Sequence, residues 1–246
     1  MLNKDYYKEK NIILTKNKII FIQNGKKKEK KLNLDLYQVR NQLKQIGFYK
    51  PYTNTTYNEY YSENLEHFGI PYMNYIYYLA FFRNLQIPTF NDFFSVYIET
   101  YCEKLKNGMY RIKQELNDEE FQFTKKQLIG RVFRSYNSFH REIDLFFQLI
   151  QEKDFEITYD FQNDLNGIDL TVTYKNKTFG IASYVATKKS NQWKQIKNTE
   201  RHQYEIKMMD IVAKMHGKDI NCDCINGIYL YSRSFVKNKI QDIKLS

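Results

Sequence analysis

One acidic side chain stands in a strand that local preference would leave without one. Residues 167–180 read GIDLTVTYKNKTFG, in which Ile168, Leu170 and Val172 lead to a Lys-Asn-Lys turn and a second strand. This alternation predicts a β-hairpin with one buried face. Asp169 lies in the first strand, where β-propensity disfavours aspartate. A residue that contradicts its local preference is typical of a functional site, so Asp169 is the first candidate.

Basic side chains follow the hairpin at helical spacing. Lys194, Lys197 and Arg201 are three and four residues apart, which puts them on one face of a helix. Lys188 and Lys189 stand at the entrance to that helix. A basic stripe beside a helix N-terminus is suited to the phosphates of a nucleic acid. A merely solvated helix face is the plainer alternative.

The whole chain carries an excess of positive charge. Its 246 residues include 38 Lys and Arg against 28 Asp and Glu, a formal net charge of +10. Clustered Lys and Arg release counterions from nucleic-acid phosphates, so DNA is the partner we expect first. A solubilising surface in a sequence rich in Lys, Asn, Ile and Tyr is the alternative. A homodimer and a protein partner both stay open.

Membrane and disulfide-rich classes are not indicated. The chain has no run of eighteen apolar residues, and MLNKDYYKEK lacks the apolar part of a secretory signal. Three cysteines do not build a disulfide framework. We therefore expect a cytoplasmic protein without a membrane partner.

The first part of the chain is expected to be mostly helical. Residues 11–23 read as two short strands around a turn, and residues 25–31 as a basic, mobile loop. Residues 34–116 carry apolar side chains at helical spacing, with many aromatic residues that we expect in the core. Residues 1–120 are therefore predicted to form an N-terminal β-hairpin and helical region.

The second part, residues 121–246, is expected to mix helices and strands. A 3.6-residue apolar period predicts a long helix over 124–151. Strands are expected at 155–161, in the hairpin and at 226–232, with another helix over 190–217. The predicted fold class is α+β.

The long helix at 124–151 is expected to have two different sides. Phe146 belongs to the apolar side, which should face the hairpin. Arg131, Arg134 and Arg141 fall roughly on a line and predict a basic, exposed side. Glu142 stands beside the apolar stripe, at the boundary between buried and solvated positions.

This order of elements resembles a known nuclease core. With Glu142 in the first helix and Asp169 in the second strand, residues 124–232 are similar to the αβββαβ core of the PD-(D/E)xK, or restriction-endonuclease-like, superfamily. The resemblance implies a Mg²⁺-dependent endonuclease that hydrolyses phosphodiester bonds of DNA, with Asp169 and Glu142 as catalytic metal ligands. Two carboxylates suffice for one Mg²⁺ that keeps several waters. In the ordinary alternative, Asp169 ends a turn or pairs with a nearby Lys, and Glu142 is a surface residue in a salt bridge with Arg141 or Arg134.

The third strand departs from the superfamily pattern. Members carry an acid or amide and a lysine two residues apart, but Ala182 and Tyr184 occupy these positions here. Either Lys188 or Lys189 supplies the missing lysine as a catalytic and DNA-binding residue, with Lys197 or Glu200 on the next helix as further options, or the site has decayed and binds no Mg²⁺. A decayed protein would act as a DNA- or protein-binding module, for instance in phage–host conflict. An RNA-binding module built on the aromatic N-terminal helices is a third hypothesis.

Overall fold

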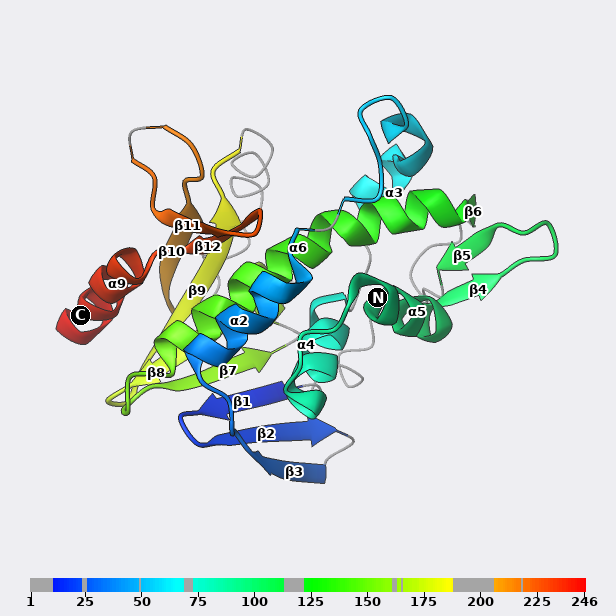
Figure 1. Cartoon of the computed structure of the whole chain (residues 1–246). Helices are drawn as coiled ribbons and strands as arrows, with labels where there is room; N and C mark the ends of the chain where they lie inside the picture. Colours follow the sequence, from blue (N-terminus) through cyan, green and yellow to red (C-terminus); the bar gives the residue numbers. More distant parts are fainter. Residues whose placement is uncertain are drawn as a thin grey trace.

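The structure is a computed structural model that combines helices and strands, so the predicted α+β class is confirmed (Figure 1). It describes residues 11–23, 26–48, 50–68, 73–112, 122–160, 163–164, 166–187, 206–217 and 219–246. Within these ranges no helix has both the length and the apolar character needed to cross a membrane.

A seven-stranded sheet forms the centre of the molecule, in the order β10-β9-β8-β7-β1-β2-β3. Neighbouring strands are antiparallel except β9 and β10, which are parallel. Its strands are β1 (Asn11–Thr15), β2 (Lys18–Gln23), β3 (Lys26–Lys31), β7 (Glu156–Asp160), β8 (Leu170–Tyr174), β9 (Lys177–Val185) and β10 (Lys207–Ala213). Because β1 pairs with β7, strands from both sides of the predicted boundary at residue 120 share one sheet.

The predicted hairpin around Asp169 is present as β8 and β9. Its turn residues Lys175 and Asn176 have φ angles of 46° and 65°, the left-handed conformation of the turns that match the twist of paired strands. Asp169 lies one residue before β8 rather than inside it. Its backbone N–H still donates to the carbonyl of Ile181 at 2.9 Å, so the pairing extends to the candidate residue.

The sequence predicted a loop for the basic run at 25–31, and this prediction is wrong for residues 26–31. Residues Lys26–Lys31 form β3, which pairs with β2 along its whole length. The strand lies at the edge of the sheet and its lysines are mostly exposed. Charged side chains on an edge strand hinder further strand pairing, which gives this run a structural role.

The predicted helix over 190–217 is contradicted at its C-terminal half. Residues Lys207–Ala213 form β10, and Ile211 is buried within the sheet rather than on a helix face. The strand expected at 226–232 does not join this sheet, because β11 (Cys222–Ile225) and β12 (Ile228–Tyr231) form a separate two-stranded sheet. A final helix that the sequence analysis missed, α9 (Arg233–Leu245), begins after the N-cap Ser232.

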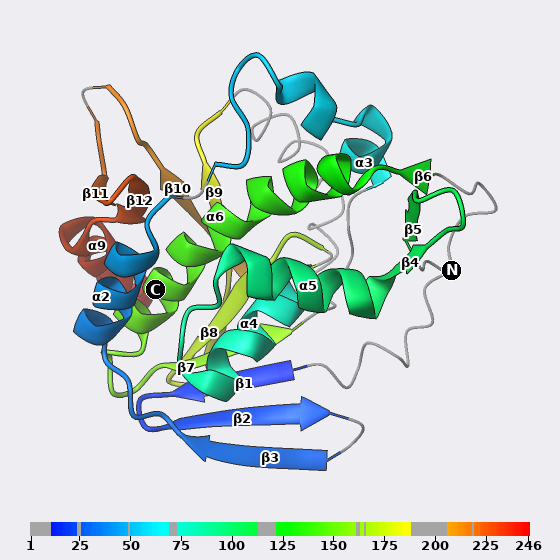
Figure 2. The ribbon, with the colours of Figure 1, turned by 45° about the vertical axis from the view of Figure 1, so that its right-hand side comes forward.

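The long helix α6 (Lys125–Leu149) crosses the sheet and packs against the other described helices and β12 (Figures 1 and 2). Thr124 caps it together with Gln127, in a reciprocal capping box. From Phe139 onward the helix is buried on all sides. Phe146 is therefore in the core, as predicted, but Arg141 is only 7% exposed and does not lie on a solvated basic face.

Shorter helices pack beside α6. They are α2 (Leu36–Ile46), η1 (Tyr57–Tyr60), α3 (Glu63–Phe68), α4 (Met73–Asn84) and α5 (Phe90–Tyr101). The helix expected to continue past residue 101 ends there, and a small sheet that was not predicted follows, formed by β4 (Cys102–Lys104), β5 (Tyr110–Ile112) and β6 (Gln122–Phe123). The aromatic stripe lies in the core, as predicted; its buried members include Tyr75, Tyr77, Tyr78, Phe81, Phe82, Phe90, Phe93, Phe94 and Tyr97.

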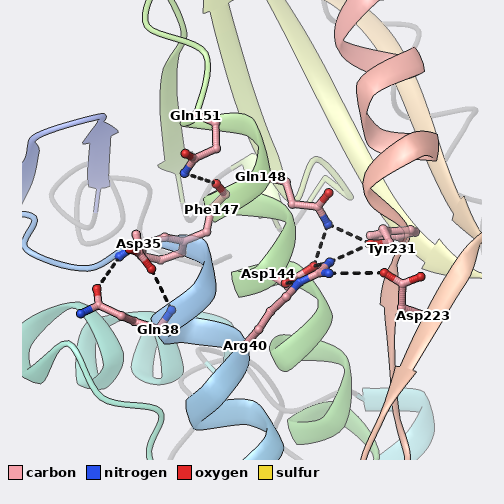
Figure 3. A network of polar contacts seen from close by, with 9 residues as sticks. All are labelled: Asp35, Gln38, Arg40, Asp144, Phe147, Gln148, Gln151, Asp223 and Tyr231. Carbon is pink, nitrogen blue, oxygen red and sulfur yellow. Dashed lines mark hydrogen bonds and ion pairs between the residues drawn. The ribbon is translucent and has the colours of Figure 1, made fainter.

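A buried ion pair connects α2 with α6 (Figure 3). Asp144 accepts hydrogen bonds from Arg40 Nε at 2.7 Å and Nη2 at 3.0 Å, and from Gln148 Nε2 at 2.7 Å. Arg40 Nη2 and Gln148 Nε2 also donate to the carbonyl of Tyr231, at 3.1 Å and 2.9 Å. This network fixes β12 against the C-terminal half of α6.

Candidate functional site

The structure brings Glu142 and Asp169 close enough for their charges to interact, although they are 27 positions apart in the sequence. Glu142 is only 6% exposed, and its Oε2 accepts a hydrogen bond from the Tyr78 hydroxyl. Asp169 Oδ2 accepts a hydrogen bond from the backbone N–H of Ser183 in β9. Each carboxylate is thus held in place by a donor from a neighbouring element.

The pKa of Glu142 is raised well above its ordinary value. Burial is the largest cause, and the negative charge of Asp169 is the second. Two carboxylates that disfavour each other's ionisation are the arrangement that a divalent cation relieves. Their oxygen atoms are also the donors that Mg²⁺ prefers, so the pair fits the predicted ion.

A third acid close to this pair was missed in the sequence analysis. The charge of Asp164 contributes to the raised pKa of Glu142. Its carboxylate accepts hydrogen bonds from Tyr159 Oη at 2.9 Å and Asn74 Nδ2 at 3.1 Å. In the sequence Asp164 stands among turn-forming residues, where an aspartate is ordinary and does not indicate a site. Across the described ranges, no three or more His, Cys, Asp and Glu side chains are arranged to hold a metal ion, so the candidate centre is a pair.

The third strand offers no further metal ligand at the expected positions. Ala182 is buried in β9, paired with Asp210 of β10. Ser183, between Ala182 and Tyr184, has its Oγ 2.9 Å from the Tyr231 hydroxyl. Because that hydroxyl donates its hydrogen to the Ile211 carbonyl, Ser183 is the donor in this contact. The strand therefore connects Asp169 to β12 through Ser183.

The predicted basic stripe cannot be placed. Lys188, Lys189, Lys194, Lys197 and Arg201 all lie outside the described residues. Their predicted roles in catalysis and DNA binding stay predictions.

A cluster of tyrosines with basic neighbours, which was not predicted from the sequence, lies at the N-terminal half of α6. Residues 50–61 contribute the half-buried rings of Tyr52, Tyr57, Tyr60 and Tyr61, and we call this segment the tyrosine segment. Cations from Lys50, Lys126 and Arg134 lie 5.7, 5.9 and 5.8 Å from ring centroids within it. Aromatic rings mixed with cations are typical of surfaces on which nucleic-acid bases stack.

Gly130 allows the tyrosine segment to approach α6. A Cβ atom at this position would lie 1.9 Å from the Tyr60 carbonyl oxygen. We expect Gly130→Ala to lower the free energy of unfolding by about 1–3 kcal/mol, because the backbone of η1 would have to move. Urea unfolding measures this change. Helix propensity alone favours alanine by about 1 kcal/mol, so a stabilised variant would show that the segment does not pack this closely.

His140 lies one residue before Arg141 and is packed rather than exposed. Neither ring nitrogen has a hydrogen-bond partner among the described residues. Its ring lies 4.4 Å from that of Tyr136 and 5.9 Å from that of Tyr77. Burial, followed by the charge of Arg141, lowers the pKa of His140 from 6.5 to about 3. It is therefore a neutral core side chain at physiological pH.

This lowered pKa predicts a pH-dependent loss of stability. His140 takes up its proton near pH 6.5 in the unfolded chain and near pH 3 in the folded chain. The contribution of the neutral ring to folding stability is therefore fully present above pH 6.5 and is lost as the pH falls below it. Between about pH 7.5 and about pH 5 the wild type should lose about 2 kcal/mol relative to His140→Phe. Urea unfolding at both pH values measures this. A difference that does not change with pH would mean that folded His140 accepts its proton normally.

Comparisons with known proteins add no relative. No protein-family model matches the chain, and neither a curated protein nor a solved structure is significantly similar to it.

Proposed function

We propose that the protein is a Mg²⁺-dependent deoxyribonuclease of restriction-endonuclease-like fold that acts on DNA in the cytoplasm. The observation that carries this proposal is the juxtaposition of Glu142, buried in α6, with Asp169 at the start of β8. A buried carboxylate next to a second negative charge is unfavourable, and its retention is understandable if a cation binds between the two.

Four residues around the acid pair have defined roles in this proposal. Glu142 and Asp169 would hold the ion, with Tyr78 and the Ser183 N–H fixing the directions of the two carboxylates. A bound Mg²⁺ would activate water for attack on phosphorus and offset the charge that develops on the phosphate. The tyrosine segment and the net charge of +10 favour a nucleic acid as substrate.

A second candidate function rests on the third strand. Ala182 cannot bind a cation, and Tyr184 stands where active superfamily members carry a lysine. These residues favour a decayed nuclease fold that binds DNA or a protein without cutting. In that case Glu142 would bind no metal ion, and its hydrogen bond with Tyr78 and its raised pKa would reflect burial in the core.

One assay separates the two candidates. The purified protein is incubated with plasmid and with single-stranded DNA in Mg²⁺, in Mn²⁺ and in EDTA, and binding to the same DNA is measured in EDTA. Cleavage that requires a metal supports the nuclease. Binding without cleavage under any metal supports the decayed fold, and the absence of both would overturn the proposal.

A further inference from the structure

Arg141 is a buried cation with few partners. Its guanidinium Nη1 donates to the carbonyl of Tyr229 over a long 3.5 Å, and its Nε has no hydrogen-bond partner among the described residues. No described carboxylate forms an ion pair with it. Arg40 and Arg111 differ, because each has a guanidinium nitrogen 2.7 Å from a carboxylate oxygen.

Such a side chain is unfavourable in the folded protein unless an anion reaches it. Arginine side chains keep their positive charge in folded proteins. A buried charge that forms no ion pair keeps much of the cost of leaving water, because attraction to more distant charges offsets only part of it. The folded chain thus maintains a position that an anionic ligand would stabilise.

Arg141 borders the candidate acid pair. It directly precedes Glu142 in α6 and contacts β12 through Tyr229. Two residues further along β12, the Tyr231 hydroxyl meets Ser183, whose backbone N–H binds Asp169. The positive charge of Arg141 also opposes the rise in the pKa values of both Glu142 and Tyr231 that burial causes. The guanidinium and both carboxylates therefore lie around the same end of β9.

We propose that Arg141 binds a phosphate group of the substrate beside the Glu142–Asp169 pair. This inference rests on the proposed function, because the acid pair by itself repels phosphate and needs a cation. The planar fork of N–H donors in a guanidinium matches phosphate oxygens. Ala182 and Tyr184 leave β9 without a positive charge near Asp169, and Arg141 supplies that charge from α6 instead.

The test uses thymidine 5′-monophosphate as the probe and thymidine as the control without phosphate. Thermal unfolding and binding are measured for the wild type, Arg141→Met, Arg141→Lys and Arg111→Met, with Mg²⁺ and with EDTA. Arg111 is the matched control, because its guanidinium pairs with Glu103 at the surface. We expect the phosphate-dependent rise of the midpoint to disappear in Arg141→Met, with binding weakened at least about tenfold, to return in part in Arg141→Lys and to persist in Arg111→Met.

The midpoint without ligand is a second readout. Arg141→Met should unfold at the same temperature as the wild type or higher, because the substitution removes a buried, unpaired charge. A strongly destabilised or unfolded Arg141→Met would overturn the proposal, since the guanidinium would then be a structural element. So would an unchanged response to the nucleotide, or no response in the wild type. DNA cleavage with an unaffected Arg141→Met would overturn this proposal alone, whereas Arg141-dependent nucleotide binding without cleavage would overturn the nuclease alone.

Discussion

Arg40→Met should lower the free energy of unfolding by about 3–5 kcal/mol, the cost of removing one partner of a buried ion pair. Asp144 is completely buried, and Arg40 is the cation that its carboxylate binds (Figure 3). Burial raises the pKa of Asp144, and the hydrogen bonds and charge of Arg40 oppose that rise. Without Arg40, Asp144 has to stay charged with only Gln148 as a donor, or take up a proton. Urea unfolding at neutral pH measures the loss.

Two measurements show whether Arg40→Met is destabilised by the unpaired charge of Asp144 or by lost packing. They are the pH dependence of its stability and the stability of a double variant. A carboxyl group whose folded pKa lies above its unfolded value contributes stability that is present at low pH and is lost as the pH rises. The deficit of Arg40→Met should therefore shrink as the pH falls. Arg40→Met combined with Asp144→Leu should be more stable than Arg40→Met alone, because no charge remains buried. Arg111→Met should cost about 1 kcal/mol or less, since that pair is exposed.

The sequence predicted correctly those helices and turns that are specified by residues close together in the chain. The capped, periodic stretch that became α6 and the turn at Lys175 and Asn176 are specified by residues close together in the sequence. The run that became β10 is different. Met208 and Ile211 are three residues apart, as on one face of a helix. Met209, Ile211 and Ala213 alternate as on one face of a strand, and pairing with β9 decides between the two periods. The lysines of β3 likewise form a strand only because β2 offers an edge.

The candidate site depended still more on long-range contacts. Asp169 was noticeable because β-propensity disfavours an aspartate inside the predicted strand, but its proximity to Glu142 was expected from a resemblance and not from any local pattern. Arg141 was assigned to a solvated face because helical periodicity cannot show that β12 packs there. Burial from all sides converts an ordinary surface residue into an unpaired interior charge, and only the tertiary structure shows this.

Asp169→Asn should reduce Mg²⁺-dependent DNA cleavage by about a thousandfold or more, because a bound metal ion supplies several kcal/mol of transition-state stabilisation. The amide keeps the size of the side chain and its ability to accept the Ser183 N–H, but it loses the charge that holds the cation. DNA binding in EDTA should change little. Initial cleavage rates of plasmid DNA and binding to the same DNA measure the two effects separately.

Glu142→Gln tests the other carboxylate of the pair. We expect this variant to lose cleavage activity but to gain stability. Cleavage should fall as in Asp169→Asn. The metal-free variant should be more stable than the wild type, increasingly so as the pH rises, because a carboxyl group with a raised folded pKa loses stability on titration and an amide does not titrate. Asp219→Asn, which alters an exposed carboxylate, should change neither property. If Asp169→Asn and Glu142→Gln cut DNA at the wild-type rate, the two acids do not hold the catalytic ion, however close together the fold brings them.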